Sequence, residues 1–179
     1  MILALYEHPE GVETSGANLA VYDFDRNTAY FGAASVPGRA LVWKLEEQAG
    51  PGERLAAPVV LDPDVEWLLR CDRVDLPRGG IAYRHTHPGP GIRCLLNGSI
   101  RIESGGKTHV YHPLEPWFEA GPEPVLAVAS EIEETAFVRA MLVPREWAGK
   151  RTIRYADPAD EEKPKLQRAT VFFDEPIEL

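Results

Sequence analysis

The stretch that decides the fold runs from Gly79 to Gly98 and reads GGIAYRHTHPGPGIRCLLNG. In an extended strand successive side chains alternate between two faces, so His85 and His87 point to the same side. Two imidazoles on one face can reach a common point, which suits a metal ion. A lone histidine is more often structural, but a same-face pair ahead of a Pro-Gly-Pro-Gly turn favours ligation. We therefore predict that His85 and His87 are metal ligands.

Turn-forming residues surround this stretch and predict a fold made mostly of strands. The chain contains 16 prolines and 15 glycines, which interrupt it at intervals too short for long helices. The segments between them are rich in β-branched and aromatic residues, and several alternate apolar with polar positions. The predicted strands are 3–7, 17–24, 29–34, 66–76, 81–87, 92–96, 99–103, 107–112, 125–130, 136–143 and 170–173.

Two dipeptides predict tight turns between neighbouring strands. Asn97-Gly98 and Gly105-Gly106 each lie between strand-like runs, as in two-residue hairpin loops, and together they predict a meander over 92–112. The segment 49–64 is expected to be a surface connection. After residue 143 the pattern changes to a C-terminal arm that either lies over the strands or reaches a second subunit. Within this arm Asp157 is expected to cap a short helical turn at 159–163.

Length and charge limit the classes of protein and of partner. The 179 residues fit a single domain, 1–179, with a core at about 66–143 between N-terminal strands (1–65) and the C-terminal arm (144–179). A formal net charge of −9 would repel nucleic acid and anionic lipid, so we expect a small-molecule ligand instead. The absence of a basic leader and of a membrane-spanning stretch predicts a cytoplasmic protein. Cys71 and Cys94 match no zinc or redox spacing and are expected to be packed, reduced thiols.

At this point the sequence resembles the cupin family. The first motif of that family has a Gly, a His-x-His, a Glu and a closing Gly, and Gly80, His85, His87 and Gly98 stand at four of these places. The place of the Glu, seven residues before the closing Gly, is taken by Gly91. The resemblance covers roughly 72–143, and it implies an all-β, double-stranded β-helix or jelly-roll-like barrel with extra N-terminal strands and a C-terminal arm.

The second cupin motif departs from the usual pattern. In YHPLEPWFEAGPEPV, Pro113 is present, but Leu114 stands at the place of the Gly and Trp117 near that of the His. This resembles a cupin subgroup with Trp-x-Glu in place of that histidine. If Trp117 faces inward, Glu119 two residues later faces inward as well. Two histidines and a carboxylate suit Fe(II), and Mn, Ni and Zn would also be accepted.

The role of Arg93 leaves two alternatives open. Arg93 is predicted to face the interior, where an unpaired guanidinium would be costly. In one alternative it pairs with Glu119 in a metal-free barrel. In the other it stands beside a metal held by His85, His87 and Glu119, and receives a substrate carboxylate in a bidentate bond.

The remaining candidates are reserves and pocket walls. Trp117, Tyr83 and Leu95 are expected to line the pocket, together with Phe137. The reserve carboxylate is Glu115 and the reserve nitrogen ligand is His112. His109 and His112 have opposite parity on one strand, so both are expected mainly at the surface.

Two functions compete on these grounds. The first is a mononuclear metal enzyme of the dioxygenase, isomerase or decarboxylase type, in which Arg93 and Glu119 are the catalytic residues beside the metal. The second is a non-catalytic small-molecule binding protein, because fold alone does not fix function. The family resemblance also implies a homodimer. Neither a Gly-x-Ser-x-Gly motif nor a phosphate-binding loop occurs, which disfavours hydrolases and nucleotide-binding proteins.

Overall fold

A computed structural model describes residues 1–178 and shows an all-β protein, which confirms the predicted fold class. Three five-stranded antiparallel sheets make up most of the chain, and the only helices in this range are two short 3-10 turns. None of the helices within residues 1–178 has the length and apolar character that a membrane crossing needs.

The first sheet, called here the N-terminal sheet, has the order β4-β3-β6-β1-β7. Its strands are β1 (Ile2–His8), β3 (Leu19–Asp23), β4 (Thr28–Phe31), β6 (Ala40–Glu46) and β7 (Glu53–Pro58). A small hairpin of β2 (Val12–Thr14) and β5 (Ala34–Val36) accompanies it. The expectation of a mere connection over 49–64 was wrong, because β7 falls within that segment and pairs with β1.

The other two sheets face each other. The central sheet has the order β13-β10-β15-β8-β17, and the outer sheet has the order β12-β11-β14-β9-β16. The strands of the central sheet are β8 (Trp67–Leu76), β10 (Gly91–Asn97), β13 (Pro116–Glu119), β15 (Thr135–Pro144) and β17 (Arg168–Pro176). Those of the outer sheet are β9 (Ile81–Thr86), β11 (Ile100–Ser104), β12 (Lys107–Tyr111), β14 (Val125–Ala129) and β16 (Arg154–Tyr155).

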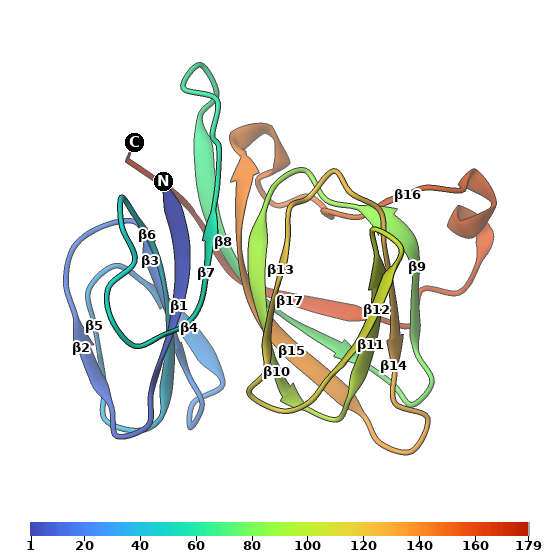
Figure 1. The fold of residues 1–179 in the computed structure, drawn as a ribbon, viewed down its shortest axis with the longest axis horizontal. Coiled ribbons are helices and arrows are strands. Elements are labelled where there is room, and N and C mark those ends of the chain that lie inside the picture. The colour runs from blue at the N-terminus through green and yellow to red at the C-terminus, as the bar shows by residue number, and fades with distance from the viewer. Residues whose placement is uncertain (179) are drawn as a thin grey trace.

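The central sheet lies between the other two sheets, so both of its faces are covered (Figure 1). Side chains alternate along its strands: Leu69 and Cys71 pack against the N-terminal sheet, whereas Val74 and Leu76 face the outer sheet. Trp43 of the N-terminal sheet also donates its indole N–H to the carbonyl oxygen of Ile92 in β10, at 3.0 Å. Cys71 and Cys94 are buried free thiols, as predicted, and they lie on the face that packs against the N-terminal sheet.

The two predicted hairpin turns had different outcomes. Gly105-Gly106 joins β11 to β12 in a hairpin that pairs Ser104 with Lys107, as predicted. Asn97-Gly98 instead carries the chain from the central sheet to the outer sheet, because β10 pairs with β13 and β15 and not with β11. A type I′ hairpin turn needs positive φ at both central residues, and here only Gly98 has it, at 78°. The meander over 92–112 was therefore wrong at its first turn.

The C-terminal arm lies over the open side of the two facing sheets. It begins with η1 (Arg145–Trp147), adds β16 to the edge of the outer sheet, and ends with β17 at the edge of the central sheet. Between β16 and β17 lies η2 (Pro158–Glu162), where Asp157 accepts a hydrogen bond from the backbone N–H of Ala159, at 2.9 Å. The predicted capped turn is thus confirmed.

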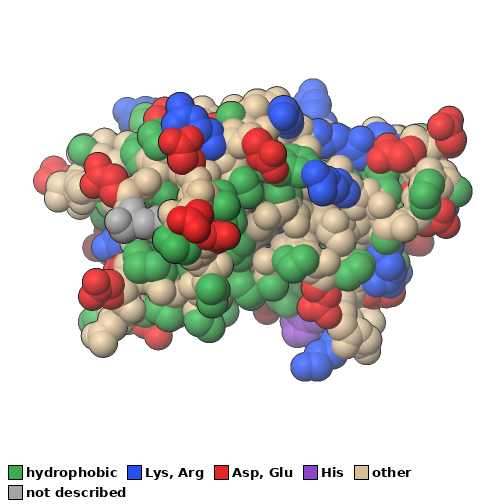
Figure 2. Space-filling model, turned by 90° about the horizontal axis from the view of Figure 1, so that it is seen from above, with side chains coloured by type: hydrophobic (Ala, Val, Ile, Leu, Met, Phe, Trp, Pro, Cys, Tyr) green, Lys and Arg blue, Asp and Glu red, His purple; other side chains and the backbone are tan. Residues whose placement is uncertain are grey.

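On the face seen in Figure 2, acidic side chains extend across the whole width, with Lys and Arg side chains interspersed among them. This face therefore offers no continuous basic surface of the kind that a nucleic acid requires.

Candidate metal centre and ligand pocket

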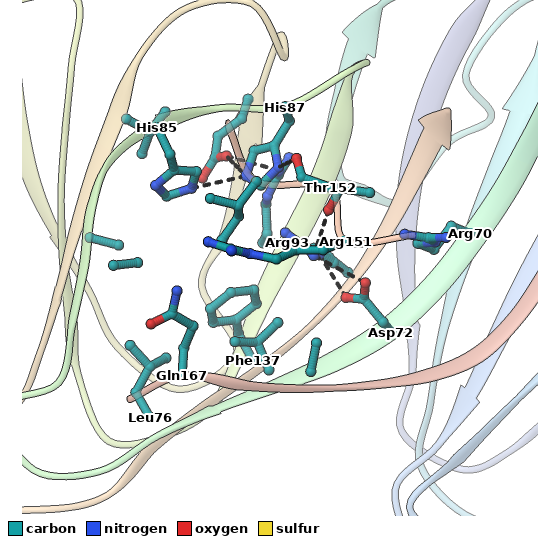
Figure 3. A pocket seen from close by; sticks show the side chains of 18 of the residues that line it. Arg70, Asp72, Leu76, His85, His87, Arg93, Phe137, Arg151, Thr152 and Gln167 are labelled. Carbon is teal, nitrogen blue, oxygen red and sulfur yellow. Dashed lines mark hydrogen bonds and ion pairs between the residues drawn. The ribbon is translucent and has the colours of Figure 1, made fainter. Parts of the chain in front are cut away.

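A cavity of about 380 Å³ lies between the central and outer sheets, within the size range of small-molecule sites. Its walls come from both sheets, and the C-terminal arm contributes residues 149–153 and several between 165 and 171. Figure 3 shows its polar side chains converging from these elements. His85, His87, Arg93, Trp117 and Glu119, all predicted from the sequence, line this one cavity.

A β-bulge in β9 sets the direction of the histidines. His85 pairs with Val125 and Ala82 pairs with Ala127, so β9 has three steps where β14 has two. Ala82 and His85 therefore both face the cavity. Tyr83 falls within the bulge and faces away from it, with Lys163 over its ring at 4.5 Å. The expectation that Tyr83 lines the pocket was wrong, because simple alternation does not hold across a bulge.

The two histidines meet through their Nε2 atoms, which lie 3.2 Å apart. The rings are nearly perpendicular, with centroids 4.8 Å apart, and both side chains are buried. Nδ1 of His85 lies 2.6 Å from the carbonyl oxygen of Tyr83, and Nδ1 of His87 lies 3.0 Å from that of Thr152. A carbonyl oxygen only accepts, so each Nδ1 must carry the proton. In their neutral forms both Nε2 atoms then present bare lone pairs to each other.

Electrostatics keep these rings neutral. Burial lowers the pKa of His85 below its ordinary value, against the opposing charge of Glu119. Burial, together with the positive charges of Arg139 and Arg93, lowers the pKa of His87 well below its ordinary value. A proton shared between the two rings is therefore disfavoured at neutral pH.

Arg93 and Glu119 form a buried ion pair beside the histidines. Nη2 of Arg93 lies 2.8 Å from Oε2 of Glu119, while Nη1 donates to the carbonyl oxygen of Gly91 at 2.6 Å. Burial lowers the pKa of Arg93 to about 10, so the guanidinium remains charged at neutral pH. Trp117 donates its indole N–H to Oε1 of Glu119 at 2.8 Å. Trp117 and Glu119 thus both face the cavity, as the Trp-x-Glu spacing predicted.

Oε2 of Glu119 has no hydrogen-bond donor among the described residues, although Arg93 is close. The approach of Nη2 lacks the angle of a hydrogen bond, so this contact is an ion pair only. The same oxygen lies 3.4 Å from Nε2 of His87. Within residues 1–178, no group of three or more His, Cys, Asp and Glu side chains is disposed to hold an ion. The arrangement is thus two converging nitrogens with a carboxylate oxygen next to one of them.

A second buried ion pair, which the sequence analysis missed, stands behind His87. Arg139 of β15 donates from Nε and Nη2 to the two carboxylate oxygens of Asp72 in β8, at 2.6 and 3.0 Å. Burial disfavours the charge of Arg139, but Asp72 outweighs this effect and raises its pKa. Arg139 also contacts the hydroxyl of Thr152, whose carbonyl receives Nδ1 of His87. Arg139, the one charged residue of the otherwise apolar β15, was the signal that could have revealed this pair.

The remaining candidates lie outside the cavity. Leu95 is fully buried in an apolar cluster with Trp117 and Phe137 but does not line the cavity. His109 and His112 are exposed, as predicted, so the reserve nitrogen ligand is not near the centre. Glu115 is exposed too and accepts a hydrogen bond from the backbone N–H of His112, at 2.7 Å.

Comparisons with protein-family models and with curated proteins identify no relative of this chain. No known protein-family model matches the chain, and the search of curated proteins finds no significant match.

Proposed function

We propose that this chain is a cupin that binds a single divalent metal through His85 and His87, with Glu119 as third ligand, and acts on a small molecule in the cavity. The first cupin motif supports the family, and so does the strand order. From β8 to β15 the chain changes between the two facing sheets at every step except the β11–β12 hairpin, with orders β13-β10-β15-β8 and β12-β11-β14-β9. This is the order of a jelly roll, the architecture that cupins share with other double-sheet proteins.

One observation carries the metal proposal: two buried, neutral imidazoles direct bare Nε2 atoms at each other across 3.2 Å. Such lone pairs repel unless a cation lies between them. Their pKa values disfavour a proton in that role. Nδ1–H bonds to backbone carbonyls are also the contacts that typically fix the tautomer of metal-bound histidines.

The distances fit the same interpretation. Ligands bonded at about 2.1 Å with angles of 90° to 109° lie roughly 3.0 to 3.4 Å apart. The two Nε2 atoms are 3.2 Å apart, and Nε2 of His87 is 3.4 Å from Oε2 of Glu119. A carboxylate has about four lone-pair directions, so Glu119 can keep Trp117 and Arg93 as partners while Oε2 faces an ion.

The donor set of two imidazoles and one carboxylate favours Fe(II), with Mn, Ni and Zn as alternatives. A metal there would supply Lewis acidity or dioxygen activation, as in oxygenases, isomerases or decarboxylases. The chain's own groups orient and enclose the reactants. Trp117 holds Oε1 of Glu119, Arg93 balances its charge, and the apolar cavity walls keep water away. Glu119 and Arg93 are therefore the proposed catalytic residues.

A second candidate function is a metal-free small-molecule binding protein. The buried Arg93–Glu119 ion pair favours it, because this pair neutralises both side chains without a metal. In that case the cavity would only hold its ligand, without chemistry at the histidines.

Metal analysis separates the two functions. The purified chain, reconstituted anaerobically with Fe(II) and then desalted, should retain about one metal ion per chain by mass spectrometry. The double variant His85→Ala/His87→Ala should lose it. The matched control is His109→Ala/His112→Ala, which removes two exposed histidines and should retain the metal. Negligible metal in the wild type, or equal metal in both double variants, would overturn the metal centre and favour the binding protein.

A further inference from the structure

Gln167 lines the cavity on the side opposite the histidines, and its amide oxygen is unpaired. It lies in the arm between η2 and β17 and lines the cavity. Figure 3 shows its side chain across the pocket from His85 and His87, near Leu76 and Phe137. Its Oε1 is buried and has no hydrogen-bond partner in the described part of the chain.

The amide is held in place by its neighbour. Nε2 of Gln167 donates to the hydroxyl of Tyr155, at 3.3 Å. The ring of Tyr155 is itself fixed, because Arg151 and Lys165 lie over it at 4.9 and 4.8 Å. A buried acceptor without a donor is costly, so native proteins rarely keep one without a reason. An oxygen fixed at a cavity wall therefore points to a donor group on the ligand.

Much of the wall between Gln167 and the histidines is apolar, although Arg151 and Lys165 of the arm line the cavity as well. Val74, Leu76 and Phe137 contribute from the central sheet, and Ala82, Ile102 and Ala127 contribute from the outer sheet. A ligand that spans this cavity must therefore have a hydrocarbon middle, since a polar group there would lose its hydration without a partner.

The charges at the histidine end favour an anionic group. The buried arginines that line the cavity are already paired: Arg93 with Glu119, Arg139 with Asp72, and Arg70 with Asp174. The buried charges thus cancel before a metal binds. The divalent ion of the proposed function would leave an excess positive charge in a largely apolar space, and a carboxylate on the ligand would offset it.

Building on the proposed function, we propose that the cavity binds a small carboxylate with an apolar middle and a terminal hydroxyl or amine, and that this terminal group donates to Oε1 of Gln167. Gln167 is then a specificity-determining residue of the arm. Its hydrogen bond favours ligands that carry a donor group at the end far from the metal.

The test uses ω-hydroxyalkanoates of increasing chain length and the matched alkanoates that lack the hydroxyl. Isothermal titration calorimetry of the Zn(II)-loaded chain should show the hydroxy acid binding about tenfold more tightly at the best-fitting length. In Gln167→Met the ratio should fall to about one, because the acceptor is lost while the side-chain volume is kept. The matched control, Gln48→Met, changes an exposed glutamine of the N-terminal half and should preserve the ratio.

A charge variant tests the direction of the hydrogen bond. Gln167→Glu offers only acceptors, so it should bind ω-aminoalkanoates more tightly than the wild type does. Weaker binding of the amine would overturn the donor assignment. Equal affinities for hydroxy acids and alkanoates in the wild type, a preference that persists in Gln167→Met, or no binding of any acid would overturn the proposal as a whole.

The two proposals fail in different ways. Metal content, measured for every variant, reports on His85 and His87 alone. If the chain holds no Zn(II), the metal centre is overturned, and the same titrations on metal-free protein still report the hydroxyl preference. A chain that holds Zn(II) but ignores the hydroxyl keeps the proposed function and loses the role of Gln167.

Discussion

Nη2 of Arg93 lies 2.8 Å from Oε2 of Glu119, and both side chains are enclosed between the central and outer sheets. The pair therefore couples stability to the candidate site, because loss of either charge would leave the other buried without its partner.

Removing the cation alone should destabilise the chain strongly. We expect Arg93→Met to lower the free energy of unfolding by about 3–5 kcal/mol in urea titrations, because Glu119 would keep a buried, uncompensated charge. The double variant Arg93→Met/Glu119→Leu should recover much of this loss. Arg101→Met, at a half-exposed arginine paired with Glu103, should cost under about 1 kcal/mol. A single-variant loss as small as that of Arg101→Met would contradict the prediction.

Gly91 stands where the cupin motif has its Glu, and the structure leaves no room for a side chain there. A Cβ at this position would lie 2.6 Å from Cγ of Met141 and 2.7 Å from the backbone oxygen of Ala140. We expect Gly91→Ala to destabilise by about 1–3 kcal/mol and Gly91→Glu to cost more without increasing metal affinity. Thermal unfolding and metal titration measure both effects. Gly50→Ala, where the nearest atom lies at 3.4 Å, is the tolerated control.

Trp117 is expected to orient Glu119 for metal binding. Trp117→Phe keeps an aromatic ring against Tyr111 and Phe137 but removes the N–H that Oε1 of Glu119 accepts. Metal affinity, measured by competition with an indicator dye, should fall about 10- to 100-fold. Trp147→Phe in η1, outside the cavity lining, should leave the affinity unchanged. Equal losses in the two variants would contradict the orienting role.

The Arg70–Asp174 pair should make the C-terminal arm sensitive to acid. Burial alone would raise the pKa of Asp174, but hydrogen bonds from Arg70 and Gly149 outweigh it and lower the pKa below its ordinary value of 3.8. A lowered carboxyl pKa contributes stability above the unfolded value, and this contribution is lost as pH falls below 3.8 through the folded pKa.

Arg70 also donates to the carbonyl oxygens of Lys150 and Trp147, so this loss should loosen the start of the arm. Hydrogen exchange between pH 5 and 3 should show the amides of 147–150 becoming less protected in the wild type. Asp174→Asn should show reduced protection already at pH 5 and little further change. Parallel pH profiles in the two proteins would contradict this account.

The sequence predicted strands and inward faces well where alternation is regular. His85, His87, Arg93 and Glu119 were placed correctly because each lies on a strand, or next to one, with a readable parity. Tyr83 was misplaced because the bulge in β9 depends on its pairing with β14, a contact distant in sequence. Asn97-Gly98 misled for a related reason, since a turn dipeptide does not specify which sheet the next strand joins.

Other parts of the site depend on contacts that no local pattern encodes. Thr152 and Gln167 reach the cavity only because β16 and β17 attach to the edges of two different sheets. Asp72 and Arg139 face each other as register partners of β8 and β15, so the pairing was hidden until the register was known. In retrospect, the single charge of Arg139 in the otherwise apolar β15 was the available clue.

The double covering of the central sheet has a practical consequence for anyone who shortens this chain. Isolating the ten strands of the central and outer sheets would expose Leu69, Ile92 and Val138 to solvent and remove the hydrogen bond from Trp43 to the backbone next to Arg93. A trimmed fragment would then combine an exposed apolar surface with a less firmly held strand at the candidate site. The N-terminal third covers and supports the sheet that carries part of the cavity wall. It should therefore be retained in any shortened version of the chain.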